Sequence, residues 1–298
     1  MSNAIPDRAT DAFVKHRNLL FTVAYEMLGS ASDAEDVLQE TWLRWVNVDL
    51  EQVRDFRAYL VRITTRQSLN MLRSQKRRRE EYVGSWLPEP ILTAPDVAED
   101  VELSESISMA LMIVLDSLSP TERAVFVLRE IFGVGYDEIS QTVEKSEAAV
   151  RQIASRARKH VDERRPRVTA TRKEQRAALE SFKHAIETGD IQAFLSVLSP
   201  DVVLIADGGG IKSAALKPVS GAKRIANALA VNIAKHNMVI GARLTTINGG
   251  PALLMTLNGE VDGILAAHLE DNMITGLYYV RNPEKLSRIE FETPLSVR

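Results

Sequence analysis

The sequence contains no cysteine, which excludes disulfide bonds, thiolate catalysis and metal sites built on cysteine. Its five histidines include no pair spaced for a helical metal site, so we expect neither a metal centre nor a cofactor. No apolar run approaches the roughly 20 residues of a membrane-spanning helix, and the first residues have no signal-peptide core. These absences together predict a cytoplasmic protein.

The rest of the composition is that of a folded globular chain. Of its 298 residues, 45% are hydrophobic and 26% are charged, which is ordinary for globular proteins and sufficient for two or three domains. The net charge of −3 conceals two strongly basic segments, residues 73–79 and 151–167. Clustered basic residues in an acidic chain indicate contacts with a polyanion such as nucleic acid.

An acidic helix is predicted over residues 33–45. Ser32 and Glu35 have the spacing of a capping box, so we expect the helix to begin at this point. Apolar residues recur on one face, from Ala34 to Trp45, while the opposite face is acidic. Such a face is either simply solvated, since acids suit a helix N-terminus, or a binding surface.

A basic helix is predicted over residues 54–79, after an amphipathic helix over residues 11–28 that ends at Gly29. One edge of the basic helix is a row of donors with no interleaved acid: Arg62, Arg66, Asn70, Arg73 and Arg77. Like charges four residues apart repel by a few tenths of a kcal/mol, so the row favours an anionic partner. A solubilising surface is the alternative.

Residues 81–102 are predicted to form a linker. Gly84 and three prolines prevent a continuous helix. Large apolar side chains nevertheless recur there, among them Tyr82, Trp86 and Leu87. Because exposed apolar groups of this size usually have a docking surface, we expect part of the linker to pack against another domain.

A helix-turn-helix is predicted at residues 136–161. Upstream, Ser119, Pro120 and Glu122 mark the start of a supporting helix. The hairpin turns near Glu144 and Lys145, and its second helix presents donors on the face opposite the core: Arg151, Gln152, Ser155, Arg156 and Lys159, with Arg158 near the boundary. Such donors can reach phosphates and base edges in the major groove. A basic hairpin without a DNA role is the alternative.

The remainder, from about residue 171, is predicted to be an α+β domain. Helical patterns are followed by four strands joined by Asn-Gly, Asn-Gly-Gly and Asp-Asn turns, which are typical of hairpins. The polar candidates for catalysis are Asp207, His268, Tyr278 and Tyr279, but no spacing ties an acid to a base. Asp207 stands beside three glycines and suits a turn. We therefore expect no enzymatic activity and no catalytic residues.

Four motifs in this order resemble regions two and four of the extracytoplasmic-function (ECF) sigma factors: DAEDVLQETWLRW, FRAYLVRITTRQSLNMLRSQKRR, LSPTERAVFVLRE and YDEISQTVEKSEAAVRQIASRAR. The resemblance implies a fold of two all-α domains, and it implies region two over residues 8–80, a linker over 81–103 and region four over 104–167. A sigma factor of this kind recruits core RNA polymerase to −10/−35 promoters through the clamp of the largest subunit and the flap of the second.

The resemblance also implies the roles of particular residues. The polymerase contact would use Asp33, Asp36, Gln39 and Glu40. The −10 element would be bound by Arg44, Arg62, Ile63, Arg66, Asn70, Arg73 and Arg77. The −35 element would be read by Arg151, Gln152, Ser155, Arg156 and Lys159. Arg66 departs from relatives that have asparagine there, which leaves the preferred −10 sequence open.

Three further motifs resemble a subgroup of these factors with a fused C-terminal SnoaL-like (NTF2-like) domain, here residues 171–298. They are YVGSWLPEP, in which Ser85 replaces an expected proline, DGGGIK and NPEKL. The resemblance predicts that this domain regulates the sigma factor in cis by docking on the linker. The residues expected to take part are Tyr82, Trp86, Leu87, Pro88, Asp207, Gly208, Gly209, Gly210, Lys212, Asn282, Pro283 and Lys285.

Other functions remain open from the sequence. One is a SnoaL-like enzyme or ligand sensor fused to a DNA-binding portion, and a small-molecule ligand in the SnoaL-like pocket is compatible with either function. Another is an ordinary helix-turn-helix repressor, which would bind a palindromic site as a dimer. The acidic face of residues 33–45 favours the sigma factor, because a repressor has no use for a polymerase-docking surface.

Overall fold

The computed structural model describes residues 8–94, 101–165, 170–236 and 238–297. Contacts divide the chain into two compact units. The helical unit consists of Met1–Arg78, Met112–Arg165 and Pro294–Arg298. The mixed unit consists of Arg79–Leu111 and Pro166–Thr293, so it contains the described part of the linker together with the C-terminal domain. Every helix in the described ranges is too short or too polar to cross a membrane.

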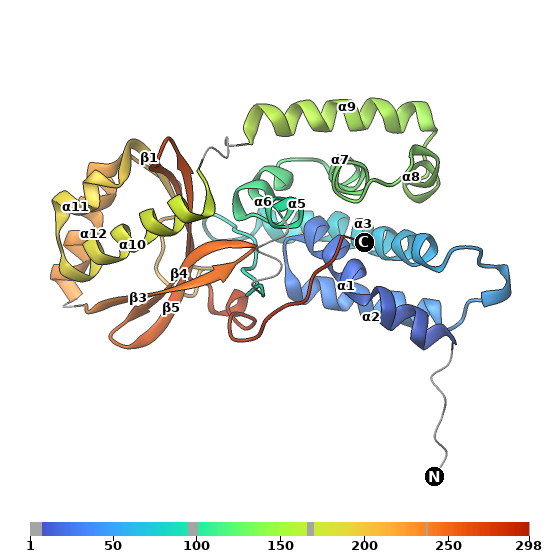
Figure 1. Ribbon diagram of the computed structural model, residues 1–298, viewed down its shortest axis with the longest axis horizontal. Coiled ribbons are helices and arrows are strands. Elements are labelled where there is room, and N and C mark those ends of the chain that lie inside the picture. Colours follow the sequence, from blue (N-terminus) through green and yellow to red (C-terminus); the bar gives the residue numbers. More distant parts are fainter. Residues whose placement is uncertain (1–7, 95–100, 166–169, 237, 298) are drawn as a thin grey trace, which may run out of the picture. The chain divides into compact units, whose positions relative to one another are not determined.

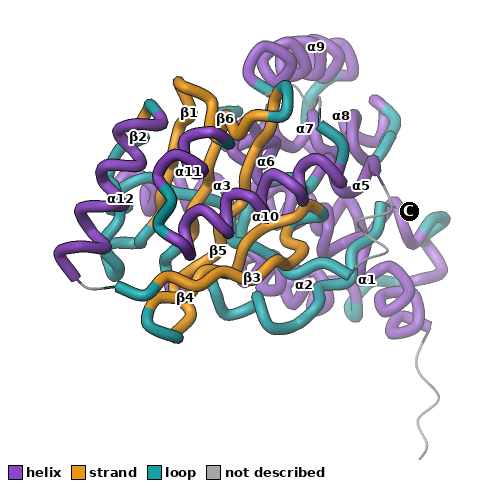
Figure 2. The backbone as a smooth tube through the Cα atoms, turned by 60° about the vertical axis from the view of Figure 1, so that its left-hand side comes forward, coloured by secondary structure: helices purple, strands orange, loops and turns teal. Residues whose placement is uncertain are grey.

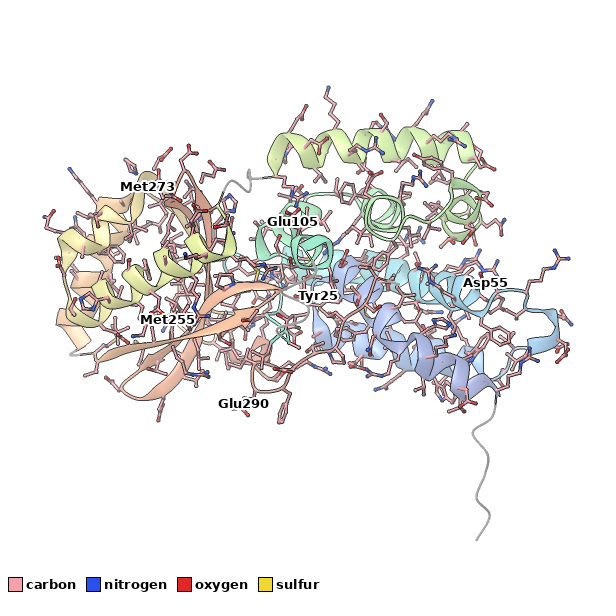
Figure 3. All side chains as sticks on the ribbon, in the orientation of Figure 1. Tyr25, Asp55, Glu105, Met255, Met273 and Glu290 are labelled. Atoms are coloured by element: carbon pink, nitrogen blue, oxygen red, sulfur yellow. The ribbon has the colours of Figure 1, made fainter. Side chains whose placement is uncertain are left out.

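The helical unit begins with α1 (Arg8–Leu28), α2 (Ala31–Trp45), the short η1 (Leu50–Gln52) and α3 (Phe56–Glu80), all in blue to cyan in Figure 1. Its second part has α7 (Pro120–Phe126), a widened helical turn η2 (Val127–Ile131), α8 (Tyr136–Val143) and α9 (Glu147–Arg164). Helix α6 (Met109–Asp116) leads into it. Tyr25 is fully buried among these helices (Figure 3).

The start of α2 differs from the sequence prediction. Ser30, not Ser32, is the N-cap, and its hydroxyl accepts a hydrogen bond from the Asp33 amide at 3.2 Å. Gly29 ends α1 with a positive φ of 69°, so the chain turns at once and the next serine caps the new helix. The predicted capping box at Ser119 and Glu122 is present at the start of α7.

The mixed unit is built on one six-stranded sheet. Its strands are β1 (Leu198–Asp207), β2 (Val219–Ser220), β3 (Ile240–Ile247), β4 (Gly250–Leu257), β5 (Glu260–Glu270) and β6 (Met273–Val280), in the order β2-β1-β6-β5-β4-β3. Strands β3 to β6 form the predicted antiparallel meander. Strand β1 joins it in parallel with β6, a pairing that the sequence pattern did not predict.

Helices α10 (Arg172–Thr188), α11 (Ile191–Ser196) and α12 (Ala222–His236) pack against this sheet (Figure 2). Their buried apolar residues, among them Phe182, Phe194 and Ile225, form one core with the sheet residues Leu265 and Leu277. Two short elements complete the unit, α5 (Val101–Ser106) and η3 (Pro283–Lys285). The sheet therefore positions the ends of β1 and β6, where the glycine-rich turn and the NPEKL segment begin.

Candidate functional site

The carboxylate of Asp207, at the end of β1, binds the linker directly. It is fully buried and accepts hydrogen bonds from the Tyr82 hydroxyl at 2.6 Å and from the Leu87 amide at 2.8 Å. The Lys285 ammonium pairs with it at 2.7 Å. A buried carboxylate is stable only when its oxygens are satisfied in this way. We call this group the Asp207 contact.

Lys285, on η3, binds both Asp207 and the linker. Its ammonium donates to the Leu87 carbonyl at 2.6 Å and lies 4.1 Å from the centre of the Trp86 ring. The Tyr82 hydroxyl accepts a hydrogen bond from the Asn282 amide at 3.0 Å. Burial, reinforced by the hydrogen bond to Asp207, raises the pKa of Tyr82, so its hydroxyl remains a donor at neutral pH.

The three glycines after Asp207 allow close approach on several sides. A Cβ on Gly208 would overlap the Lys212 carbonyl oxygen, and one on Gly209 would overlap the Asn282 side chain. A Cβ on Gly210 would lie 3.2 Å from Val83 in the linker. The glycine run thus brings the DGGGIK turn, the NPEKL segment and the linker into contact.

The turn is the basis of a stability prediction. In Gly209→Ala the residue keeps a left-handed φ of 64°, a strain of about 1–2 kcal/mol, and its methyl group overlaps Asn282, adding about 1–3 kcal/mol. We expect a lower urea midpoint for the mixed unit. Gly259→Ala is the matched control, because Gly259 has a φ of 86° but a Cβ at that position would have nothing within 4 Å. Equal losses in the two variants would refute the Asn282 contact.

The other predicted residues of this region lie in or near the Asp207 contact, with one exception. Leu87 and Pro88 are buried, and Pro283 is the first residue of η3. Lys212 does not bind the linker; its ammonium donates to the Asp262 carbonyl at 3.0 Å and pairs with the Asp262 carboxylate at 3.3 Å. Lys212 therefore connects the glycine turn to a different group of residues.

A second contact holds the linker at the β3–β4 turn. The Asn248 side chain accepts from the Ile91 amide at 3.2 Å and donates to the Ile107 carbonyl at 2.9 Å. The Thr93 amide donates to the Thr246 carbonyl at 3.1 Å, and the Thr93 hydroxyl accepts from the Gly249 amide at 3.0 Å. The sequence pattern predicted only a hairpin turn at Asn248 and Gly249, and this role was missed.

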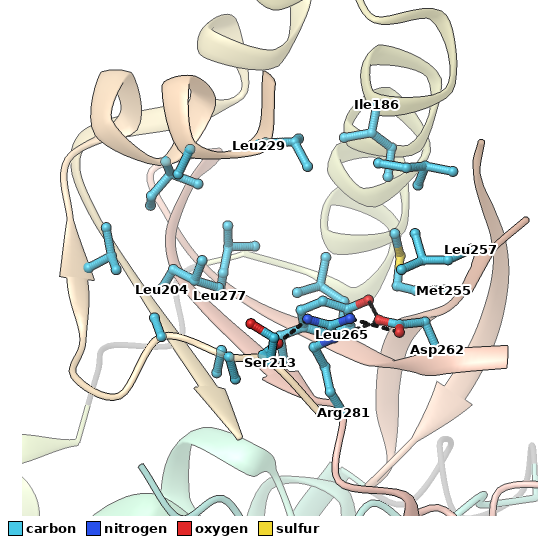
Figure 4. A pocket seen from close by; sticks show the side chains of 18 of the residues that line it. Ile186, Leu204, Ser213, Leu229, Met255, Leu257, Asp262, Leu265, Leu277 and Arg281 are labelled. Carbon is cyan, nitrogen blue, oxygen red and sulfur yellow. Dashed lines mark hydrogen bonds and ion pairs between the residues drawn. The ribbon is translucent and has the colours of Figure 1, made fainter. Parts of the chain in front are cut away.

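An apolar cavity of about 390 Å³ lies between the sheet and the three helices of the mixed unit. Figure 4 shows Ile186 of α10 and Leu229 of α12 on one side, with Asp262 and Arg281 at the opposite end. Most of the lining is aliphatic or aromatic. A cavity with an apolar body and one polar end suits a small amphipathic molecule.

The polar end is an ion-paired cluster. Arg281 binds both carboxylate oxygens of Asp262, at 2.7 and 2.9 Å, and also donates to the Ser213 carbonyl, while the Tyr279 hydroxyl donates to Asp262. Burial opposes ionisation of Asp262, but the hydrogen bonds from Arg281 and Tyr279 outweigh it and hold the pKa of that carboxyl below its ordinary value. An ionised, fully bonded carboxylate of this kind is a weak general base.

The four polar candidates from the sequence are not gathered in one site, although His268 and Tyr278 both lie beside Gly276 on the neighbouring strands β5 and β6. Asp207 binds the linker, whereas Tyr279 lines the cavity. His268 and Tyr278 are not among the residues that line it. His268 lies 3.5 Å from Glu270, and burial raises the pKa of Tyr278 to about 12. Asp262 and Arg281 were not predicted from the sequence, although an aspartate within an otherwise apolar strand was a signal of a polar group facing a cavity.

In the helical unit, the acidic face of α2 is partly engaged and partly open to solvent. The Asp33 carboxylate accepts from the Gln75 amide at 2.7 Å. Asp36, Gln39 and Glu40 are exposed. The exposed part of the face therefore lies over the middle of α2.

The donor row on α3 is solvent-accessible in part. Asn70 and Arg73 are exposed, as is Arg44 on α2, whereas Arg62 and Ile63 are half-buried. Arg66 is occupied: its guanidinium donates to the Gln141 and Thr142 carbonyls at 2.7 and 3.3 Å, at the end of α8. Residues 76–80 lie in α3, but the Arg77 side chain falls outside the described set.

The helix-turn-helix has the predicted geometry. Glu144 ends α8 with a left-handed φ of 55°, so a non-glycine residue makes the turn, and Ser146 caps α9. All five predicted donors on α9, namely Arg151, Gln152, Ser155, Arg156 and Lys159, are exposed. Arg158 instead forms a two-bond pair with Glu130, at 2.7 and 3.1 Å, which joins α9 to η2.

A buried arginine that the sequence did not single out joins α7 to α1. The Arg123 side chain is 2% exposed; its Nε donates to the Glu26 carbonyl at 3.0 Å, and it pairs with Asp116 at 3.3 Å. Burial lowers the pKa of Arg123 to about 10, which leaves it charged at neutral pH. Burying a charge in this way requires such partners, so α7 is fixed on α1.

Comparison with known proteins identifies the family. Residues 12–78 match the family model "Sigma-70 region 2", and residues 108–161 match "Sigma-70, region 4". The chain is 33% identical over 284 residues to "ECF RNA polymerase sigma factor SigJ" of Mycobacterium tuberculosis, covering 91% of each chain. The chain belongs to the ECF sigma factor family. The predicted family is thereby confirmed.

The likeness of this sigma factor to its relatives extends through the C-terminal domain. A second relative, "Probable ECF RNA polymerase sigma factor SigI" of Mycobacterium tuberculosis, is 30% identical over 96% of this chain and 97% of its own length. The crystal structure of Mycobacterium tuberculosis SigJ superposes with a TM-score of 0.75 at 30% identity, covering 96% of this chain and 99% of that one. The predicted fold class, two helical sigma regions followed by an α+β domain of helices on one sheet, is confirmed.

Proposed function

We propose that this sigma factor brings core RNA polymerase to −10/−35 promoters and that its C-terminal domain restrains it in cis through the linker. The polymerase would dock on the α2 face formed by Asp33, Asp36, Gln39 and Glu40. The −10 element would lie along the α3 row with Arg44 and Ile63, and the −35 element on the exposed donors of α9. The observation that supports this proposal is the Asp207 contact, in which the buried carboxylate binds Tyr82 and Leu87 of the linker as well as Lys285 of the NPEKL segment.

The restraint follows from what the linker does in a sigma factor. The linker connects the two DNA-binding regions, so its conformation limits the spacing at which they reach their promoter elements. The Asp207 contact and the second contact at the β3–β4 turn, made by Asn248 and Thr93, together fix residues 82–93, with Leu87 and Ile91 fully buried. Arg66, a proposed −10 residue, is meanwhile bound to α8. We therefore propose that this is a resting conformation, from which promoter binding requires release.

The proposed −35 surface gives a second prediction. Arg156→Ala removes an exposed donor from α9, and we expect promoter binding by the holoenzyme to weaken by about 1–3 kcal/mol, which is the worth of a good base contact. Arg158→Ala on the same helix is the control, since Arg158 is already paired with Glu130. Fluorescence anisotropy with a labelled promoter duplex measures both. Equal weakening in the two variants would argue against base readout by this face.

Run-off transcription tests the overall proposal. Core polymerase with the full chain should produce promoter-specific transcripts from a genomic fragment library, and core polymerase alone should not. Binding to duplex DNA without any transcript would instead favour a helix-turn-helix repressor.

The cavity favours ligand binding over catalysis, and we propose no enzymatic activity and no cofactor. Asp262 is held ionised by Arg281 and Tyr279, so it has no proton to donate as a general acid, and its lone pairs already accept hydrogen bonds and are not available to a general base. The cavity remains available to a small molecule.

A further inference from the structure

We infer that the cavity of the C-terminal domain binds an amphipathic carboxylate, with its head group at Arg281, and that binding loosens the Asp207 contact. The second half of this inference rests on the proposed regulatory function, whereas the first half does not. Residues at the polar end of the cavity are sequence neighbours of residues in the Asp207 contact. Arg281 directly precedes Asn282 after β6, and Lys212 directly follows the glycine turn after β1.

The volume of the cavity limits the size of the apolar part of the ligand. Its volume of about 390 Å³ is more than twice the roughly 150 Å³ of an engineered cavity that takes up benzene. The walls are formed by residues such as Ile186, Leu229 and Leu277, which offer dispersion contacts and no hydrogen bonds. A chain of about ten carbons, or two fused rings, matches these walls.

The charges at the polar end favour an anionic head. Arg281 and Lys212 supply two positive charges, and Asp262 supplies one negative charge, so the cluster retains one net positive charge. The bonds from Arg281 to Asp262 and to the Ser213 carbonyl use three of the five N–H groups that a guanidinium carries. A guanidinium has the forked geometry that suits a carboxylate.

The same residues connect the cavity to the Asp207 contact. The Arg281 amide donates to the Asp207 carbonyl at 2.7 Å, and the next residue, Asn282, bonds to Tyr82 of the linker. Ser213, whose carbonyl accepts from Arg281, follows Lys212 at the end of the glycine turn. Gly210 of that turn packs against Val83 of the linker. A carboxylate that accepts from the two remaining N–H groups shares the Arg281 guanidinium with the Ser213 carbonyl and draws it toward the head group, which weakens the bond to Ser213. The turn that packs on the linker is thereby loosened.

Calorimetry on the full chain, with decanoate as the probe, tests binding. We expect decanoate to bind and the neutral decan-1-ol to bind at least on the order of tenfold more weakly, which is about 1.4 kcal/mol. Leu229→Trp fills the cavity and should abolish binding, while Val231→Trp, at an exposed site on the same helix, should leave it unchanged. Arg281→Met should remove the preference for decanoate over the alcohol. Equal binding of acid and alcohol, or binding unaffected by Leu229→Trp, would overturn the site.

Amide hydrogen exchange tests the coupling. Decanoate should raise the exchange of residues 82–93 by on the order of tenfold in the wild-type chain and leave it unchanged in Leu229→Trp. Binding without any change in linker exchange would overturn the coupling alone. The proposed regulatory function is tested separately, by Asp207 variants without any ligand, so the two failures are distinguishable.

Discussion

In Asp207→Ala, the amides of residues 82–93 should exchange with solvent at least on the order of 100-fold faster than in the wild-type chain. The substitution leaves the 12% exposed Lys285 ammonium without its carboxylate, and the Leu87 amide without its acceptor. Removing one partner of a buried ion pair costs about 3–5 kcal/mol, and each 1.4 kcal/mol is about tenfold in an equilibrium. Hydrogen exchange with mass spectrometry measures the loss directly.

The control for this prediction lies on the same strand. Asp201 is an exposed residue of β1 that bonds to Ser199, and Asp201→Ala should leave linker exchange unchanged. Exchange near β4 and β5 should also be unchanged in Asp207→Ala if the domain stays folded. Wild-type protection of residues 82–93 in that variant would mean that the linker is held by other contacts.

Charge reversal on α2 should have the second large effect. Asp36 and Glu40 are exposed one helical turn apart, and Asp36→Arg with Glu40→Arg presents two positive charges where the polymerase would meet two negative ones. Like-charge contacts across an interface cost several kcal/mol, so we expect affinity for core polymerase to fall by on the order of 100-fold. A binding titration with labelled sigma factor measures it.

A control variant and a test of folding show whether the loss of affinity is specific to the α2 face. Glu180→Arg, on an exposed site of α10, changes charge away from the proposed interface and should bind polymerase normally. Circular dichroism should show the same helix content in all variants, because neither Asp36 nor Glu40 has a buried side chain. Unchanged affinity in the doubly reversed variant would remove the α2 face from the polymerase contact.

The sequence was a good guide to elements formed by local rules. The capping box at Ser119, the turn at Glu144 and the Asn-Gly hairpin turns follow from short-range geometry, and all are present. The start of α2 was mispredicted because Ser30 and Ser32 both stand three residues before an acid. Only the tight turn at Gly29 selects the first of them.

Contacts between distant segments could not be predicted in the same way. The local sequence around Asn248 predicts only a hairpin turn. Its bonds to Ile91 and Ile107 depend on the path of the linker, which the local sequence does not determine. Asp262 meets Arg281 only because β5 and β6 pair in one register. The Asp207 contact was predicted only from motifs that resemble a subgroup of sigma factors. The hydrophobic periodicity of the sequence gives no indication that residue 207 contacts residue 82.

The most direct test of the central claim is single-round run-off transcription with core polymerase and either the wild-type chain or Asp207→Ala, on a promoter that the wild type uses. We expect several-fold more transcript with Asp207→Ala, because the released linker lets both DNA-binding regions reach their elements. Asp201→Ala should match the wild type. Equal transcript from Asp207→Ala and the wild type, together with faster exchange in its linker, would contradict the claim that this contact restrains the sigma factor.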